Sequence, residues 1–259
     1  MQSKIFASII ISLFLMTGAW AQWNTQFVDN EGNTGKHTKM VLDSNGRPHI
    51  FYVTDDVHYH HAWWTGLGWG LERLFSSPSA VNEAELDGTV DRNGNWYLCW
   101  IRRSHSPPTR SELYYSTNER DTVLTWIGDG EYYYVAIALD TSGFPHIVDY
   151  NSQTNQLEHW WKSSSGWRMD TIESYSPDIR RPSMVIDNQN HIYVAYYKSG
   201  DLKLAVRDGA VWGTSYVDLT NDVGDYCSLK LDQTGRVCIS YYDATNRDLK
   251  YAVGTPSLK

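Results

Sequence analysis

Cysteine is scarce in this chain, and its scarcity excludes a fold held together by disulfides. The 259 residues include three cysteines, and an odd number leaves at least one thiol unpaired. Cys227 and Cys238 flank one expected hairpin turn, so they are the pair that could form a bridge. Stability must therefore come mainly from side-chain packing.

Long apolar runs are absent after the first 21 residues. Within those residues a lysine, the apolar stretch Ile5–Met16 and the small residues Ala19 and Ala21 predict an export signal that is removed. No later stretch approaches the roughly 20 apolar residues that a membrane-spanning helix needs. We therefore expect a signal peptide over residues 1–21 and a single mature domain over residues 22–259, secreted or periplasmic.

Positive charge is also in deficit. Lysine and arginine number 22 against 30 aspartates and glutamates, which gives a formal net charge of −8. Nucleic acids and anionic membranes attract basic surfaces, so neither is expected as a partner. A chain of this length is usual for one all-β domain, and we expect it to be a monomer.

What the sequence does contain is a phrase repeated five times, Asp-x-x-Gly, with Asn190 replacing the glycine in the fourth copy. The aspartates are 48, 49, 47 and 45 residues apart, a period that predicts an array of supersecondary units. The fourth residue of each phrase needs a positive φ, which suits glycine and asparagine. These aspartates are therefore expected to form turns and not to act as catalytic acids. The five copies begin at Asp43, Asp91, Asp140, Asp187 and Asp232.

Four strand-like runs belong to each repeat. The run before the aspartate alternates in polarity, with apolar residues such as Ile137 and Leu139 on one face. The run after it is rich in β-branched and aromatic residues, as in His49–Tyr52, and a third run follows. The fourth run begins with a tryptophan in four of the five repeats. These tryptophans are Trp69, Trp126, Trp167 and Trp212.

The fifth such tryptophan lies at the other end of the chain. The last repeat stops after its third run, and the segment Trp23–Asp29 resembles Trp212–Asp218. We therefore predict an all-β fold, a five-bladed β-propeller whose ring is closed by the N-terminal strand completing the last blade. The expected blades span residues 36–74, 83–130, 132–174, 180–218, and 224–254 together with 22–29.

The repeats resemble those of secreted bacterial β-propeller proteins written Asp-x-x-Gly-x-Pro-His-Ile-x-Tyr, as in Asp43–Tyr52 and Asp140–Ile147. They resemble more distantly the Asp-box propellers of sialidase type, although the Ser-x-Asp-x-Gly-x-x-Trp spacing is not met, and polysaccharide-lyase propellers. The resemblance covers nearly all of the mature chain. It implies the fold, and it implies a lectin, a polysaccharide lyase or a hydrolase. No catalytic motif matches, so it assigns no catalytic residue.

The copies stop matching at one end of the expected channel. The first strand of each blade should line the channel, so its start lies at the mouth opposite the Asp-x-x-Gly turns. Six residues before each turn aspartate the blades offer differing ionisable or hydroxyl side chains. Because these residues differ from blade to blade, they favour one central site with acid–base chemistry. The alternative is that polar residues fill the mouth because it is solvated. The candidate catalytic residues are His37, Glu85, Tyr134, Arg181 and Tyr226.

Further residues near this mouth are candidates for substrate binding. Arg102 and Arg103 lie in the longest expected loop and could bind an anion together with Arg180, although an ordinary solvated loop has the same composition. Asp149 stands where other copies have an aromatic residue, unless a one-residue slip makes Tyr150 the equivalent. The candidate binding residues are Arg102, Arg103, Asp149, Tyr150, Arg180, Tyr197, Lys198, Asp225 and Asp243.

Histidines cluster at His58, His60 and His61. On a strand His58 and His60 share one face, and a metal bound there would need a third ligand such as His37. No zinc-site spacing occurs, so we expect neither a metal nor a cofactor.

These features together predict a secreted protein that acts on extracellular carbohydrate at one central site. A small anionic ligand also fits, and an acidic polysaccharide is the expected substrate. In a β-elimination, Arg181 or Arg102 would neutralise a uronate carboxylate, while Tyr134, Tyr226 or His37 would act as base and acid.

Glycoside hydrolysis fits less well than β-elimination, because it normally needs two opposed carboxylates. Glu85 has as candidate partners Asp225, Asp149 and Asp243. A non-catalytic lectin or interaction scaffold is the alternative function, and a tailoring enzyme for a small metabolite in the same pocket is the other.

Overall fold

A computed structural model describes residues 25–55, 58–76, 86–103, 111–118, 125–130, 132–175 and 177–256. The export signal expected over residues 1–21 and the candidate Glu85 lie outside these ranges. For Arg102 and Arg103 the structure describes the backbone alone. The described chain is all-β, with 19 strands in five sheets. Within it, no helix is long and apolar enough to cross a membrane.

Each of the five sheets corresponds to one sequence repeat, and neighbouring strands are antiparallel. The first sheet contains β1 (Lys36–Leu42), β2 (Pro48–Thr54), β3 (His58–Trp64) and β4 (Trp69–Ser76). The second contains β5 (Leu86–Val90), β6 (Trp96–Arg103), β7 (Ser111–Thr117) and β8 (Thr125–Gly130). The third contains β9 (Tyr132–Leu139), β10 (Pro145–Asn151), β11 (Gln156–Ser163) and β12 (Gly166–Glu173). The fourth contains β13 (Ile179–Ile186), β14 (Ile192–Lys198), β15 (Asp201–Asp208) and β16 (Val211–Asp218). The fifth contains β17 (Val223–Leu231), β18 (Val237–Asp243) and β19 (Asp248–Gly254).

The repeated aspartates form turns, as the sequence predicted. In the first copy, Asp43 Oδ1 accepts hydrogen bonds from the backbone N–H groups of Asn45 and Arg47, both at 2.8 Å. The other four copies repeat this pair of bonds. The fourth residue has a positive φ in every copy, 72° at Gly46 and 67° at Asn190. A carboxylate that already caps its own turn is poorly placed to act as a catalytic acid.

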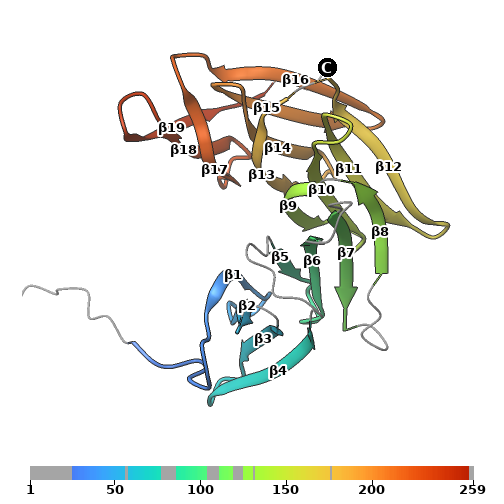
Figure 1. Cartoon of the computed structure of the whole chain (residues 1–259), viewed down its shortest axis with the longest axis vertical. Coiled ribbons are helices and arrows are strands. Elements are labelled where there is room, and N and C mark those ends of the chain that lie inside the picture. The colour runs from blue at the N-terminus through green and yellow to red at the C-terminus, as the bar shows by residue number, and fades with distance from the viewer. Residues whose placement is uncertain are drawn as a thin grey trace, which may run out of the picture.

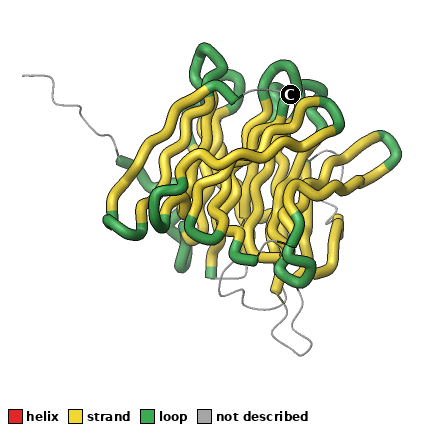
Figure 2. The backbone as a smooth tube through the Cα atoms, turned by 90° about the horizontal axis from the view of Figure 1, so that it is seen from above, coloured by secondary structure: helices red, strands yellow, loops and turns green. Residues whose placement is uncertain are grey.

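The first strands of successive sheets pack against one another in chain order, so that the sheets follow an arc (Figure 1). Residues of these inner strands line a central cavity, the channel. Figure 2 shows the strands running side by side between two layers of turns. Lys39 Nζ pairs with Asp87 Oδ1 at 3.0 Å, and Asp87 Oδ2 accepts the N–H of Ile137 at 3.0 Å. These contacts tie the first three sheets together along the channel wall.

The hydrophobic core lies between adjacent sheets. Val148 and Leu157 of the third sheet pack with Val194 and Ala205 of the fourth, and all four are fully buried. Similar clusters join the first sheet to the second, the second to the third, and the fourth to the fifth. The three cysteines are free thiols, and Cys238 pairs across the ladder with Lys230, three residues beyond Cys227.

The two ends of the arc are where the structure does not show the ring closure that the sequence predicted. The fifth sheet has three strands, and residues 25–29 form no strand. Asp29 instead accepts a hydrogen bond from the Tyr52 hydroxyl of the first sheet at 2.8 Å. The described residues show no packing of β17 against β1 comparable with that between the other inner strands. Closure of the ring by the N-terminal strand therefore stays a prediction.

Candidate functional site

Strained backbone marks the channel mouth. His37, Arg181 and Tyr226, each six residues before a turn aspartate, have φ values of 51°, 45° and 55°. At each of them the ladder register shifts by a bulge between the first and second strands of the sheet. Non-glycine residues rarely adopt positive φ, and each instance costs on the order of 1–3 kcal/mol. Such strain clusters at functional sites in proteins.

The mouth contains a pocket of about 260 Å³ lined by His37, Tyr134 and Arg181. Tyr226 joins this group through the Arg181 guanidinium, whose carbon lies 3.8 Å from the Tyr226 ring centre and 5.5 Å from that of Tyr134. Arg181 therefore contacts two tyrosine rings from neighbouring sheets. Four of the five residues proposed as catalytic from the sequence thus lie together at one point.

The arginines of the mouth are neutralised by aspartates. Arg181 pairs with Asp225 at 2.9 Å, and Arg180 pairs with Asp178 at 2.6 Å while stacking on Tyr197. Partial burial opposes the charge of Arg181, but the hydrogen bond to Asp225 raises the pKa of that guanidinium above its ordinary value. The sequence predicted a group of arginines here that binds an anion. The charges of the two described arginines, Arg180 and Arg181, are balanced by Asp178 and Asp225.

Three expected binding residues are buried. Asp149 is fully buried, and Tyr150 is buried with its hydroxyl 3.2 Å from Asn155 Oδ1. Asp243 is buried because it caps the turn to β19, accepting two hydrogen bonds from Asn246 at 2.9 Å. Asp149 has no exposed surface for a substrate, and the binding roles expected for Tyr150 and Asp243 stay predictions.

Lys198 lies at the end of β14, at the joint between the third and fourth sheets. Its ammonium group pairs with the carboxylate of Glu173 on β12, which also accepts the hydroxyl of Tyr196. Lys203 contacts the same carboxylate at 2.8 Å. Lys198 therefore helps to hold two sheets together, and part of its charge is already balanced.

This arrangement recurs at the joints and was missed in the sequence. The Tyr241 hydroxyl donates to Asp218 at 2.7 Å, just as Tyr52 donates to Asp29. In each case an acid that precedes one sheet bonds to the tyrosine nine residues after that sheet's turn aspartate. Aligning the repeats on both positions would have revealed the pairing.

The joint before the third sheet departs from this rule. Asp149 pairs across the ladder with Glu158, at the positions where Tyr196 faces Lys203, so no one-residue slip occurs. Both oxygens of Asp149 and Oε2 of Glu158 are buried without a hydrogen-bond partner. Burial, together with the neighbouring Glu158 charge, raises the pKa of Asp149 well above its ordinary value, and burial raises that of Glu158.

The histidine cluster forms a relay across the first sheet. His61 Nδ1 lies 2.9 Å from Glu72 Oε1, and its Nε2 lies 2.9 Å from His49 Nδ1. His58 and His60 take separate partners, Ser76 and Thr54. Within the described residues no group of three or more histidine, cysteine or acidic side chains is placed to hold a metal.

The third sheet repeats the relay with His146, His159 and Asp170, again with contacts of 2.9 Å. A tryptophan of the following sheet donates to the acid at 3.0 Å in both cases, Trp96 to Glu72 and Trp212 to Asp170. Burial lowers the pKa of His159 and lowers that of His146 to about 4. The missed signal was an acid 11 residues after the second histidine in both sheets, with the two histidines 12 residues apart in the first sheet and 13 in the third.

Sequence comparison does not assign the chain to a family. No family model matches the chain. It is 23% identical over 217 residues to the glucose-binding protein GlcS of Saccharolobus solfataricus, covering 80% of this chain and 35% of the relative. The chain thus spans about a third of the length of this curated relative.

Solved structures of similar shape include lectins and a polysaccharide lyase. The lectin of Aleuria aurantia in complex with a fucosylated disaccharide matches with a TM-score of 0.55 at 12% identity, covering 84% of this chain and 77% of the lectin. An ulvan lyase of family PL25 matches with a TM-score of 0.55 at 11% identity, covering 83% and 63%. Another Aleuria aurantia lectin structure, described as a six-bladed β-propeller, matches with a TM-score of 0.52 at 10% identity, covering 86% and 78%. The chain therefore has a β-propeller fold built from five described sheets.

Proposed function

We propose that this propeller is an exported protein that binds carbohydrate at the mouth of its channel, and that an acidic polysaccharide is its substrate. The observation that carries the proposal is that His37, Tyr134 and Arg181 line one pocket while the Tyr226 ring packs on the Arg181 guanidinium, with three of these four residues held in strained backbone. Lectins and a polysaccharide lyase among the similar structures, and a distant glucose-binding relative, support a sugar ligand.

Tyrosine rings at the mouth suit the face of a sugar. Tyr226 is 62% exposed and Tyr133 is 37% exposed, so both offer apolar ring surface to solvent. The hydroxyl of a tyrosine can hydrogen-bond a sugar while its ring packs on the C–H face. The paired Arg181 and Asp225 add donors and acceptors beside these rings.

The proposed reaction is β-elimination at a uronate residue. A base removes the proton from C5, the electron pair forms a C4–C5 double bond, and the C4–O bond breaks as its oxygen takes a proton. His37 has the residue type for the base near neutral pH, and Tyr134 or Tyr226 for the acid. Arg181 would stabilise the charge that develops on the uronate carboxylate, with Asp225 holding the guanidinium in place.

A second candidate is a lectin without catalysis. Asp225 and Asp178 already neutralise Arg181 and Arg180, which weakens the attraction of these two arginines for a polyanion. Such a surface suits a neutral sugar at least as well as a uronate.

One set of measurements separates the two candidates. Purified protein is incubated with uronic acid polysaccharides while the ultraviolet absorbance of the unsaturated product is followed, and a glycan panel is titrated by calorimetry. We expect product formation that Tyr134→Phe slows and Arg181→Ala abolishes. The control Arg168→Ala changes an exposed arginine on β12, a strand remote from the channel. Binding without product establishes the lectin, and the absence of both contradicts the proposal.

A further inference from the structure

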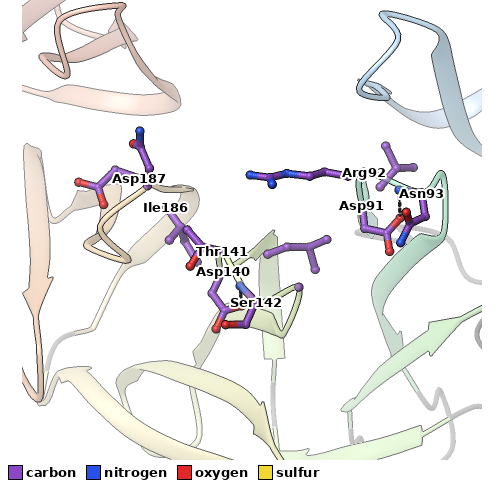
Figure 3. Close-up of a pocket in the computed structure, with 12 residues that line it drawn as sticks. Asp91, Arg92, Asn93, Asp140, Thr141, Ser142, Ile186 and Asp187 are labelled. Carbon is purple, nitrogen blue, oxygen red and sulfur yellow. Dashed lines mark hydrogen bonds between the residues drawn. The ribbon is translucent and has the colours of Figure 1, made fainter.

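A second cavity lies at the opposite end of the channel from the mouth. Its volume is about 440 Å³, and it is formed by the Asp-x-x-Gly turns of the second, third and fourth sheets (Figure 3). Small-molecule sites in proteins typically occupy about 300–1,000 Å³. The cavity is separate from the mouth pocket, with which it shares no lining residue.

The carboxylates of these turns are committed to the backbone. Asp91 Oδ1 accepts from the N–H groups of Asn93 and Asn95 at 2.8 and 2.9 Å. Asp140 and Asp187 make the same pairs of bonds in their own turns. Much of their negative charge is therefore spread over backbone donors. The residues that follow these aspartates line the cavity, namely Arg92, Asn93, Thr141, Ser142 and Asn188.

The turns are also braced against their neighbours. Ser44 Oγ donates to the carbonyl oxygen of Arg92 at 3.0 Å, and the N–H of Thr141 donates to Asn190 Oδ1 at 2.9 Å. A ligand entering this cavity therefore meets a shape that is already formed. Preorganisation of this kind reduces the entropy lost on binding.

The lining combines an apolar floor, hydroxyl and amide groups, the three turn carboxylates and one guanidinium. Figure 3 shows Arg92 reaching from its turn across the cavity toward the turns of the third and fourth sheets. Among the described residues, no carboxylate forms an ion pair with Arg92. The floor consists of the last residues of three inner strands, and the polar groups stand above it. The floor residues are Val90, Leu139 and Ile186, and the polar residues are Asn93, Thr141, Ser142 and Asn188.

We propose that this cavity binds a small hydroxylated anion, of the class of sugar acids. Arg92 would hold the carboxylate, Ser142 and Asn188 the hydroxyl groups, and the branched side chains of the floor the C–H face of the ring. The inference does not depend on chemistry at the mouth, because the two sites lie at opposite ends of the channel.

The test is calorimetric titration with glucuronate, using glucose as the neutral comparison. The mouth variant Arg181→Ala serves as the background, so that the arginine of that pocket makes no contribution to the binding signal. We expect one equivalent of glucuronate to bind and glucose to bind much more weakly. Arg92→Ala should weaken glucuronate binding on the order of tenfold or more, the loss typical of a hydrogen bond to a charged group.

Arg47→Ala is the matched control, since Arg47 is exposed in the equivalent turn of the first sheet and does not line the cavity. It should leave the affinity unchanged. Equal affinity for glucose, an unaltered affinity in Arg92→Ala, or no binding of glucuronate would each overturn the assignment. If the function proposed for the mouth is wrong, Arg181→Ala will act on and bind polysaccharide as the unaltered protein does. The two proposals therefore fail in different measurements.

Discussion

Asp149 shows how one residue changes the chemistry of a joint between sheets. At the equivalent position Tyr52, Tyr196 and Tyr241 donate a hydroxyl to an acid. Asp149 cannot do so when ionised, and its ladder partner is the carboxylate of Glu158. Two like charges in a buried site disfavour each other's ionisation, so the folded state holds protons that the unfolded chain releases.

Asp149→Asn should therefore stabilise the protein at pH 8. The pKa of Asp149 is raised in the folded protein, whereas an unfolded aspartate has a pKa of about 3.9. The free energy of unfolding therefore falls as pH rises from about 3.9 toward the pKa of the folded state, by up to about 1.4 kcal/mol per pH unit. The free energy of unfolding, measured by urea titration, should rise by about 1 kcal/mol or more at pH 8 and change least near pH 4. The control Glu31→Gln alters an exposed carboxylate and should change neither value. A loss of stability at pH 8 would contradict this account.

The strained residue His37 allows a second test at this scale. Glycine adopts its φ of 51° without cost, so His37→Gly should raise the free energy of unfolding by up to about 1 kcal/mol. Ligand binding at the mouth should weaken in the same variant. Thr38→Gly, at the next exposed position and without a positive φ, should lower stability instead, so equal effects of the two glycines would refute the role of strain.

At the scale of strands, the two histidine relays join three strands within a sheet to a tryptophan of the next sheet. Burial lowers the pKa values of His49, His146 and His159, which disfavours their charged forms in the folded protein. Because the pKa of His146 falls to about 4 while the unfolded value is about 6.5, the unfolded chain binds a proton first as pH falls. Acidification therefore lowers the free energy of unfolding through the relays, whereas through Asp149 it raises that free energy.

His146→Asn should make the loss of stability between pH 6.5 and pH 4.5 shallower. A histidine with a lowered pKa changes the free energy of unfolding by up to about 1.4 kcal/mol per pH unit in that window. The slope is measured from the free energy of unfolding at several pH values. His58→Asn, which removes a histidine bonded to Ser76 outside the relays, should leave the slope as it is. Identical slopes in all three proteins would argue against the relays as the source.

At the scale of the whole molecule, the arc of sheets leaves β19 as the outer strand of a three-stranded sheet. Leu249, Tyr251 and Val253 of this strand are 83%, 62% and 48% exposed. An exposed edge with apolar side chains invites pairing with another strand. The segment ending at Asp29 matches the fourth strand of the fourth sheet, which makes it the expected partner.

We expect a disulfide to form between Thr25→Cys and Ala252→Cys under mild oxidation. Thr25 corresponds to Thr214, which pairs with Ala205, the equivalent of Ala252. Cys238→Ser in the same protein removes the partly exposed native thiol. Non-reducing electrophoresis and peptide mapping should show an intramolecular bridge. Ser164→Cys, in an exposed turn of the third sheet, replaces Ala252→Cys as the control and should not cross-link. A bridge formed only between two copies would refute closure within one chain.

The sequence by itself determined the repeat, its turns and its strand pattern. These follow from local chemistry, because the Asp43 carboxylate caps the backbone two to four residues away and Gly46 supplies the positive φ. It also placed His37, Tyr134, Arg181 and Tyr226 at one mouth, because a fixed offset from each turn fixes the height along the inner strand.

The tertiary structure alone decided which side chains find partners across sheets. Asp225 neutralises Arg181 from a strand 44 residues away, Asp149 pairs across the ladder with Glu158, and four histidines of the first and third sheets bond along relays. Such contacts depend on how neighbouring sheets pack, and the spacing within one repeat carries no information on that packing. The scarcity of cysteine agrees with this picture, because all three thiols are free and packing between sheets carries the fold.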